Sequence, residues 1–254
     1  MPLKIAVAGK GGTGKTTLAG GLAFYFSERY KVIAVDSDPS MNLHTALGVE
    51  NPEPISELKD LIKSRTVVTD GIYNMNPKVE DIPDAYSTST ADGRLKLMVM
   101  GTVEKGGEGC MCPESTFLRA LLRHLVLKRD EVLILDTEAG IEHFGRKTAE
   151  GFDVMLILCE PSVKAIQTAN RIYVLSKEIG INKIYAIANK IASDDQMNFI
   201  KKELAFEILS FIPYDDEVIK ADMLGEPLTD RHPHPKALQS IEDVGKTVEK
   251  SRQK

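Results

Sequence analysis

The chain has 254 residues, of which 43% are hydrophobic and 27% charged, values typical of a globular protein that buries a core. Its formal net charge of −5 provides no general attraction to DNA or to anionic membranes. No apolar stretch approaches the roughly 20 residues that span a bilayer, and the N-terminus leads directly into an apolar run, so we expect no signal peptide. Three cysteines favour a reducing cytoplasm over a disulfide framework. We therefore expect a cytoplasmic protein that binds neither nucleic acid nor a membrane.

Apolar strand-like runs alternate with helical patterns, which predicts an α/β fold with a mostly parallel central sheet flanked by helices in three layers. The expected strands are 3–8, 32–36, 95–100, 132–136, 154–159, 184–189 and 208–212. The expected helices are 15–29, 114–128, 162–178, 194–204, 216–223 and 235–250. Within segment 51–93 we expect a helix at 55–63, a strand near 71–77 and a loop at 87–93. We interpret this segment as a family-specific insertion into one domain that spans residues 1–254.

A glycine-rich loop follows the first expected strand. Residues 9–17 read GKGGTGKTT and satisfy the G-x-x-x-x-G-K-[ST] phosphate loop in its strand–loop–helix setting. Glycines let backbone N–H groups wrap a polyphosphate, and the next helix offers its positive end to the same anion. Lys15 is expected at the β and γ phosphates, and the Thr16 hydroxyl can ligate Mg²⁺. A glycine turn with a chance Lys–Thr pair is the alternative. The motif predicts a P-loop NTPase that binds ATP or ADP with Mg²⁺ through Gly11, Gly12, Thr13, Gly14, Lys15, Thr16 and Thr17.

Carboxylates end two of the expected strands. Asp36 and Asp38 close the second strand, and Asp136 ends the apolar run 132–136. Ligands of open α/β sheets bind at the carboxyl ends of the strands. An Asp at the position of Asp136 can hold the water ligands of Mg²⁺, as phosphoryl transfer needs. Ordinary turn carboxylates are the alternative for Asp36 and Asp38.

A cysteine pair, Cys110 and Cys112, precedes the expected helix 114–128. Side chains two residues apart in an extended segment point to one side, so the pair can supply half of a tetrahedral thiolate site for Zn²⁺ or another soft metal. A two-fold axis beside the pair would complete a Cys₄ site in a homodimer. Two reduced thiols without a ligand, or a strained disulfide, are the alternatives. Cys159 ends a core strand and is expected to be a small buried hydrophobe.

These motifs together resemble one group of P-loop ATPases. The loop KGGTGKTT, with its additional lysine Lys10, is similar to the deviant phosphate loop of the nitrogenase iron protein, the septum-site and partition ATPases, and the arsenite and nickel-maturation ATPases. The resemblance implies that Lys10 reaches the nucleotide of a partner subunit, that Asp38 orients or activates the attacking water, and that Asp36 lies near the Mg²⁺ shell. A solvated surface lysine is the alternative for Lys10.

The same resemblance extends to the expected base-binding segments. Asn189 matches the position that reads adenine, and Pro213 belongs to a loop that flanks it. Residues 189–192 read NKIA and lack the Asp of the guanine-reading N-K-x-D pattern, which favours ATP over GTP.

The cysteine region narrows the resemblance further. The glycine-rich run that ends at Cys110 is similar to the sequence around the first cluster-binding cysteine of the nitrogenase iron protein. The second cluster-binding cysteine of that protein has no counterpart here, because residues 140–145 contain no cysteine. The C-x-C pair together with DTEAGIEH at 136–143 resembles the CooC family, ATPases that assist nickel insertion into carbon monoxide dehydrogenase. The resemblance implies a dimeric ATP hydrolase and metallochaperone that holds Ni²⁺ or Zn²⁺ on Cys110 and Cys112. Its client would be carbon monoxide dehydrogenase or an enzyme of the acetyl-CoA synthase type.

Two other functions stay open from the sequence. An electron carrier would hold a [4Fe–4S] cluster on Cys110 and Cys112 of both subunits. A partition or septum-placement ATPase would leave the C-x-C pair without a use. His143 is an additional ligand, a relay or, as many histidines are, a hydrogen-bonded structural residue.

Overall fold

The computed structural model describes residues 3–69, 72–101, 113–129, 131–137 and 146–251. Its central sheet has eight strands in the order β10-β9-β8-β1-β7-β2-β6-β5. Neighbouring strands run parallel, except that β5 runs antiparallel to β6. The strands of this sheet are β1 (Leu3–Gly9), β2 (Val32–Ser37), β5 (Thr88–Ser89), β6 (Leu95–Val99), β7 (Val132–Thr137), β8 (Val154–Cys159), β9 (Ile184–Ile191) and β10 (Ile208–Pro213).

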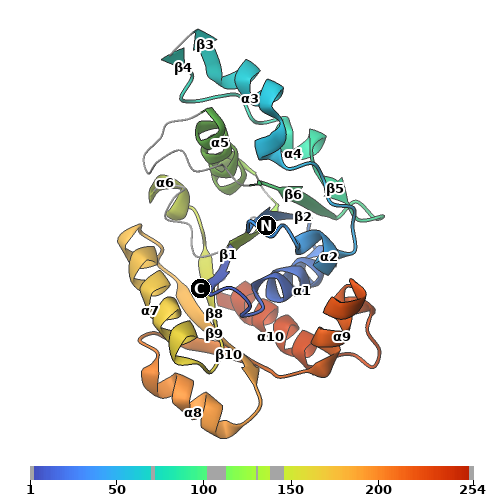
Figure 1. Ribbon diagram of the computed structural model, residues 1–254, viewed down its shortest axis with the longest axis vertical. Helices are drawn as coiled ribbons and strands as arrows, with labels where there is room; N and C mark the ends of the chain where they lie inside the picture. The colour runs from blue at the N-terminus through green and yellow to red at the C-terminus, as the bar shows by residue number, and fades with distance from the viewer. Residues whose placement is uncertain (1–2, 70–71, 102–112, 130, 138–145, 252–254) are drawn as a thin grey trace.

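Helices cover both faces of this sheet (Figure 1). The α-helices of the described residues are α1 (Lys15–Ser27), α2 (Leu43–Leu47), α3 (Lys59–Thr66), α4 (Ile82–Ala85), α5 (Pro113–Lys128), α6 (Arg146–Ala149), α7 (Val163–Glu178), α8 (Asp194–Glu203), α9 (Asp216–Leu224) and α10 (Lys236–Ser251). Short 3₁₀ turns lie at Ile55–Glu57 and Leu228–Asp230, and β3 (Val67–Thr69) pairs with β4 (Ile72–Tyr73) in a separate two-stranded ribbon.

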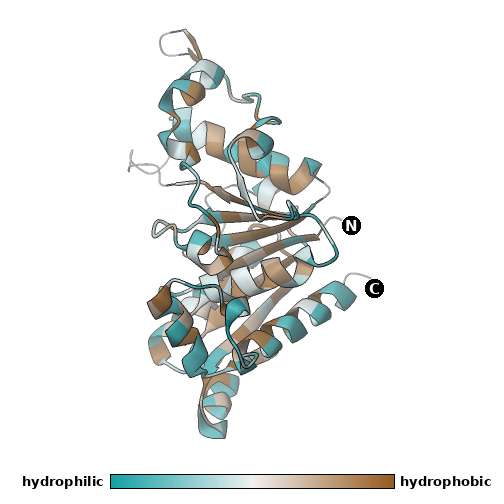
Figure 2. Ribbon diagram, turned by 90° about the vertical axis from the view of Figure 1, so that its right-hand side faces the viewer, coloured by the Kyte–Doolittle hydropathy of each residue, from teal (hydrophilic) through white to brown (hydrophobic). Residues whose placement is uncertain are grey.

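Two hydrophobic core clusters lie between the sheet and the helices, one on each face of the sheet. One contains Ala6 and Ala8 of β1 with buried residues of α3, α5, α7 and α8, and the other contains Ile5 and Val7 with buried residues of α1, α2 and α10. Successive residues of a strand point to opposite faces, so a strand covered on both sides is apolar at most of its positions. Figure 2 shows the central strands at the hydrophobic end of the colour scale for this reason. The predicted three-layer α/β fold is confirmed.

The segment 51–93 differs in detail from the sequence-based expectation. The expected helix starts as a 3₁₀ turn and becomes regular only at Lys59. The stretch expected as a loop contains β5, which pairs with β6 through Thr88 and Ser89. A polar Ser/Thr run is indistinguishable from a loop in the sequence, and only the neighbouring edge of β6 gives it a partner. That the segment is a family-specific insertion into a single domain stays a prediction.

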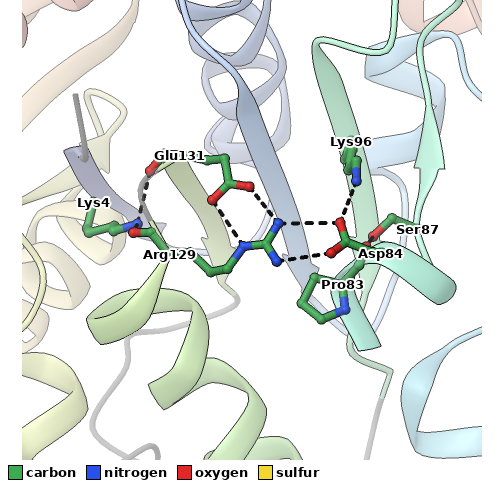
Figure 3. Close-up of polar contacts among 7 residues, drawn as sticks. All are labelled: Lys4, Pro83, Asp84, Ser87, Lys96, Arg129 and Glu131. Atoms are coloured by element: carbon green, nitrogen blue, oxygen red, sulfur yellow. Dashed lines mark hydrogen bonds and ion pairs between the residues drawn. The ribbon is translucent and has the colours of Figure 1, made fainter. Parts of the chain in front are cut away.

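Ion pairs tie this segment to the sheet (Figure 3). Asp84 of α4 accepts hydrogen bonds from Lys96 Nζ at 2.7 Å and from Arg129 at 3.2 Å. These two cations, Arg129 first, lower the pKa of Asp84 to about 2. Lys4 of β1 in turn donates to the backbone carbonyls of Arg129 and Glu131 at 2.8 and 2.9 Å. The network therefore connects α4, β6, the start of β7 and β1. Within the described ranges, none of the helices combines the length and the apolar character that crossing a membrane requires.

Candidate nucleotide site

The phosphate loop follows β1, which lies between β7 and β8 in the middle of the sheet. Thr13 closes the loop on itself: its Oγ1 and its backbone N–H both donate to the Lys10 carbonyl, at 2.7 and 3.2 Å. Gly14 then starts α1 with a φ of +94°, a conformation that glycine adopts without steric cost. A Cβ at this position would also collide with the Asn189 side chain. The loop therefore requires glycine here for two independent reasons.

The buried carboxylate of Asp136 contacts Thr16, which follows the phosphate lysine. Asp136 is paired in register with Asp36 across β7 and β2, and it is fully buried, with 0% exposure. Its Oδ2 accepts a 2.7 Å hydrogen bond from Thr16 Oγ1. Its Oδ1 has no hydrogen-bond partner among the described residues. Burial raises the pKa of Asp136 to about 7, against the opposing effect of the Thr16 hydrogen bond.

The Asp36 carboxylate accepts hydrogen bonds from the backbone of the loop that follows β2. Its Oδ1 accepts from the N–H of Asp38 at 3.0 Å, and its Oδ2 accepts from the N–H of Leu43, the first residue of α2, at 2.9 Å. Burial raises its pKa in spite of these two bonds. Asp36 therefore shapes the segment that carries Asp38. The helix α2 that it caps was not expected from the sequence, because five residues are too short for a helical period to show.

Asp38 lies beside the lysine of the loop. Its Oδ2 is 3.6 Å from Lys15 Nζ, and the two side chains are only 15% and 5% exposed. Burial works to raise the pKa of Asp38, but the N–H of Ser40, at 2.9 Å, and the charge of Lys15 outweigh it, so the pKa lies below its usual range. Asp38 is thus an ionised acceptor next to Lys15.

A cavity of about 150 Å³ opens next to Gly14 and Thr17. Asn189 and Pro213 line it, and so do residues of the loop after Pro213, of α9 and of α10. These residues are Tyr214 and Asp215 of the loop, Val218 and Ile219 of α9, and Ala237 and Ile241 of α10. The sequence predicted a helix over 235–250, but no signal in it placed this helix beside the phosphate loop.

Asn189 is already engaged on both sides of its amide. Its Nδ2 donates to the Thr13 carbonyl at 2.6 Å, and its Oδ1 accepts from the N–H of Lys190 at 2.8 Å. Its role in reading adenine stays a prediction, to which the structure adds a contact with the phosphate loop.

The remaining predicted site residues either lie at the surface of the loop or fall outside the described residues. Lys10 is partly exposed and Gly11 is exposed at the tip of the loop. Cys110, Cys112 and His143 lie outside the described residues. Across the ranges that are described, no group of three or more His, Cys, Asp or Glu side chains is arranged to hold a metal ion.

Known proteins share this architecture. Residues 4–228 match the CobQ/CobB/MinD/ParA nucleotide binding domain family. The carbon monoxide dehydrogenase accessory protein CooC of Rhodospirillum rubrum is 41% identical over 261 residues, covering 96% of this chain and 98% of CooC. An ATP-binding protein of Methanocaldococcus jannaschii is 47% identical over 251 residues, covering 95% of this chain and 96% of that protein. The septum site-determining protein MinD of Pyrococcus horikoshii, solved with Mg-ADP, superposes with a TM-score of 0.71 at 20% identity, covering 99% and 98% of the two chains; this likeness concerns the fold.

The fold and the loop thus define a P-loop nucleotide-binding ATPase. The chain belongs to the CobQ/CobB/MinD/ParA family, and CooC is one of its homologues. At the level of the protein family, the prediction of an ATPase that uses ATP or ADP with Mg²⁺ is confirmed, and so is the resemblance to CooC.

Proposed function

We propose that this protein is a dimeric ATPase that delivers nickel to carbon monoxide dehydrogenase or a related enzyme. The observation that carries the proposal is the 41% identity to CooC across nearly the whole of both chains. The C-x-C pair at 110–112 supports it, because paired thiolates are suitable ligands for Ni²⁺ or Zn²⁺ in transit.

The nucleotide half of the proposal uses the contacts described above. Thr16 and Asp136 would hold Mg²⁺: Asp136 Oδ1 is buried and finds no partner in the described part of the chain, its Oδ2 accepts from the Thr16 hydroxyl, and both groups are oxygen ligands of the kind Mg²⁺ prefers. When bound, Mg²⁺ neutralises charge on the phosphates. Lys15 would bind the β and γ phosphates and so leave its ion pair with Asp38. The freed Asp38 carboxylate would then accept a hydrogen bond from the attacking water and orient it.

The metal half depends on a second copy of the chain. Cys110 and Cys112 supply two thiolates, and two subunits related by a two-fold axis would supply the four ligands of a tetrahedral site. Lys10 would contact the nucleotide of the partner, so that ATP draws the subunits together. Hydrolysis would then loosen the dimer and allow the metal to leave for the client enzyme.

The direct test is activation of a nickel-depleted carbon monoxide dehydrogenase. Purified protein loaded with Ni²⁺ should restore activity in the presence of ATP, and Lys15→Ala protein loaded equally should not. Equal activation by free Ni²⁺ at the same concentration would contradict the proposal. Stoichiometric iron and sulfide in anaerobically purified protein would instead favour an electron carrier.

A further inference from the structure

The phosphate loop is held from outside by two consecutive residues of β9. A loop that turns its N–H groups toward a phosphate turns carbonyls the other way, and these carbonyls need donors. Asn189 supplies one to Thr13, as described above. Lys190 supplies the next: its Nζ donates to the carbonyl of Gly12 at 2.6 Å. Neighbouring carbonyls of the loop are therefore bound by neighbouring side chains of one strand.

The backbone of Lys190 indicates that this position is imposed by its surroundings. Its φ is +60°, a left-handed conformation that is unfavourable for a residue other than glycine. The Asn189 side chain stabilises this turn, because its Oδ1 accepts from the Lys190 N–H at 2.8 Å. In a regular strand, two consecutive side chains point to opposite faces of the sheet. Because of the left-handed turn, the side chains of Asn189 and Lys190 both reach the phosphate loop.

An acidic partner balances the charge of Lys190. Glu160, directly after β8, has its Oε2 at 3.6 Å from Lys190 Nζ. Its Oε1 is 3.4 Å from the hydroxyl of Ser162, the residue that caps α7. The ammonium group is thus placed between the loop carbonyl and a carboxylate fixed at a helix start.

We propose that Lys190 is a positioning residue for phosphate binding. It holds the Gly12 carbonyl outward so that the N–H groups of the loop stay in the arrangement that receives the phosphates. Glu160 keeps the ammonium group there when no nucleotide is bound. The inference rests on nucleotide binding by the loop, which the family supports, and it is independent of the proposed role in nickel delivery.

Lys190 also lines the cavity beside Gly14, so the test must distinguish an effect on the phosphate loop from an effect on the binding of the base. Two probes do so: ADP, which has a base, and inorganic tripolyphosphate, which has none. We expect Lys190→Met to weaken the binding of both by about tenfold, about 1.4 kcal/mol. We expect Lys190→Arg to restore most of the affinity, because it keeps a charged donor. Glu160→Gln should stay within about threefold of wild type, since the contact with Gly12 remains. Lys164→Met, at an exposed lysine of α7, is the matched control and should change neither affinity.

Calorimetric titration of both probes, with thermal unfolding of the nucleotide-free variants, decides the matter. Equal losses for ADP and tripolyphosphate, with an unchanged unfolding midpoint and rescue by Arg, support the proposal. A loss confined to ADP would place Lys190 at the base and overturn it. No loss for either probe would do the same. A lower unfolding midpoint of nucleotide-free Lys190→Met protein that Lys190→Arg does not restore would also overturn the proposal, because it would assign Lys190 to folding alone.

Discussion

Thr16 Oγ1 donates a 2.7 Å hydrogen bond to Asp136 Oδ2, which joins the first turn of α1 to the end of β7. The contact brings together two residues 120 positions apart in the chain and leaves the second Asp136 oxygen buried and without a partner among the described residues. A buried carboxylate with one free oxygen is unfavourable as an anion unless a cation joins it. This arrangement supports the proposal that Thr16 and Asp136 hold Mg²⁺.

The first prediction concerns pH. The pKa of Asp136 is raised from 3.8 to about 7 in the folded chain, so the native state keeps a proton that the unfolded chain releases as pH rises through about 4. The stabilising effect of this proton is full below about pH 4 and is lost as pH rises to about 7. In EDTA, the free energy of unfolding of Asp136→Asn relative to wild type should therefore rise by up to about 4 kcal/mol between pH 4 and 7. Urea unfolding at several pH values measures this difference, and a difference independent of pH would contradict the assignment.

The second prediction concerns hydrolysis. Lys15→Ala removes the cation expected at the β and γ phosphates, so ATP turnover should fall to background while the fold persists. Asp38→Ala should still bind ATP and should lose turnover by on the order of 10² or more, because only the carboxylate that orients water is removed. Phosphate release measured beside ATP binding separates the two. Wild-type turnover in the Asp38 variant would rule out its proposed role.

The third prediction concerns Lys10. In its own subunit the Lys10 contacts that the structure describes are those of its backbone carbonyl, which Thr13 binds, so truncating the side chain should leave the loop intact. Lys10→Ala should bind ATP normally but fail to dimerise with it in the absence of metal. Light scattering with and without ATP measures the mass, and Lys164→Ala serves as a lysine control outside the site. An ATP-induced dimer in the Lys10 variant would show that the contact across subunits is wrong.

The fourth prediction concerns the metal. Saturation with Ni²⁺ should occur at one ion per two chains, and the ion should promote dimerisation without nucleotide. Binding should release protons and weaken at low pH, because the thiols must ionise. Cys110→Ala and Cys112→Ala should each abolish these effects while nucleotide binding persists. Thiolate charge-transfer absorption followed beside sedimentation gives both readouts.

Cys159→Ala provides the matched control for the metal. Cys159 is fully buried, and burial raises the pKa of its thiol to about 12, so it holds no thiolate for a metal to bind near neutral pH. Its removal should leave the Ni²⁺ stoichiometry unchanged. One Ni²⁺ per single chain, or full binding by the double variant at 110 and 112, would mean that the shared site does not exist.

Much of this architecture could be predicted from the residues alone. The strands of the central core are mostly apolar because both faces of the sheet are covered, and the phosphate loop has a spacing that serves one chemistry. Asp36 and Asp136 were expected at one edge because parallel strands end together. The short elements α2 and β5 were missed, since a few residues show no period and gain their stability from neighbours distant in sequence.

The sequence by itself determined the fold class, the phosphate loop and the identity of the carboxylates that follow the strands, because each depends on local pattern and on strand direction. Only the tertiary structure decided which atoms meet: that Asp136 bonds Thr16, that Asp38 pairs with Lys15, and that Asn189 and Lys190 hold the carbonyls of Thr13 and Gly12. The reason is physical. These contacts depend on the register between strands and on the left-handed turn at Lys190, and both are set by packing across the whole sheet.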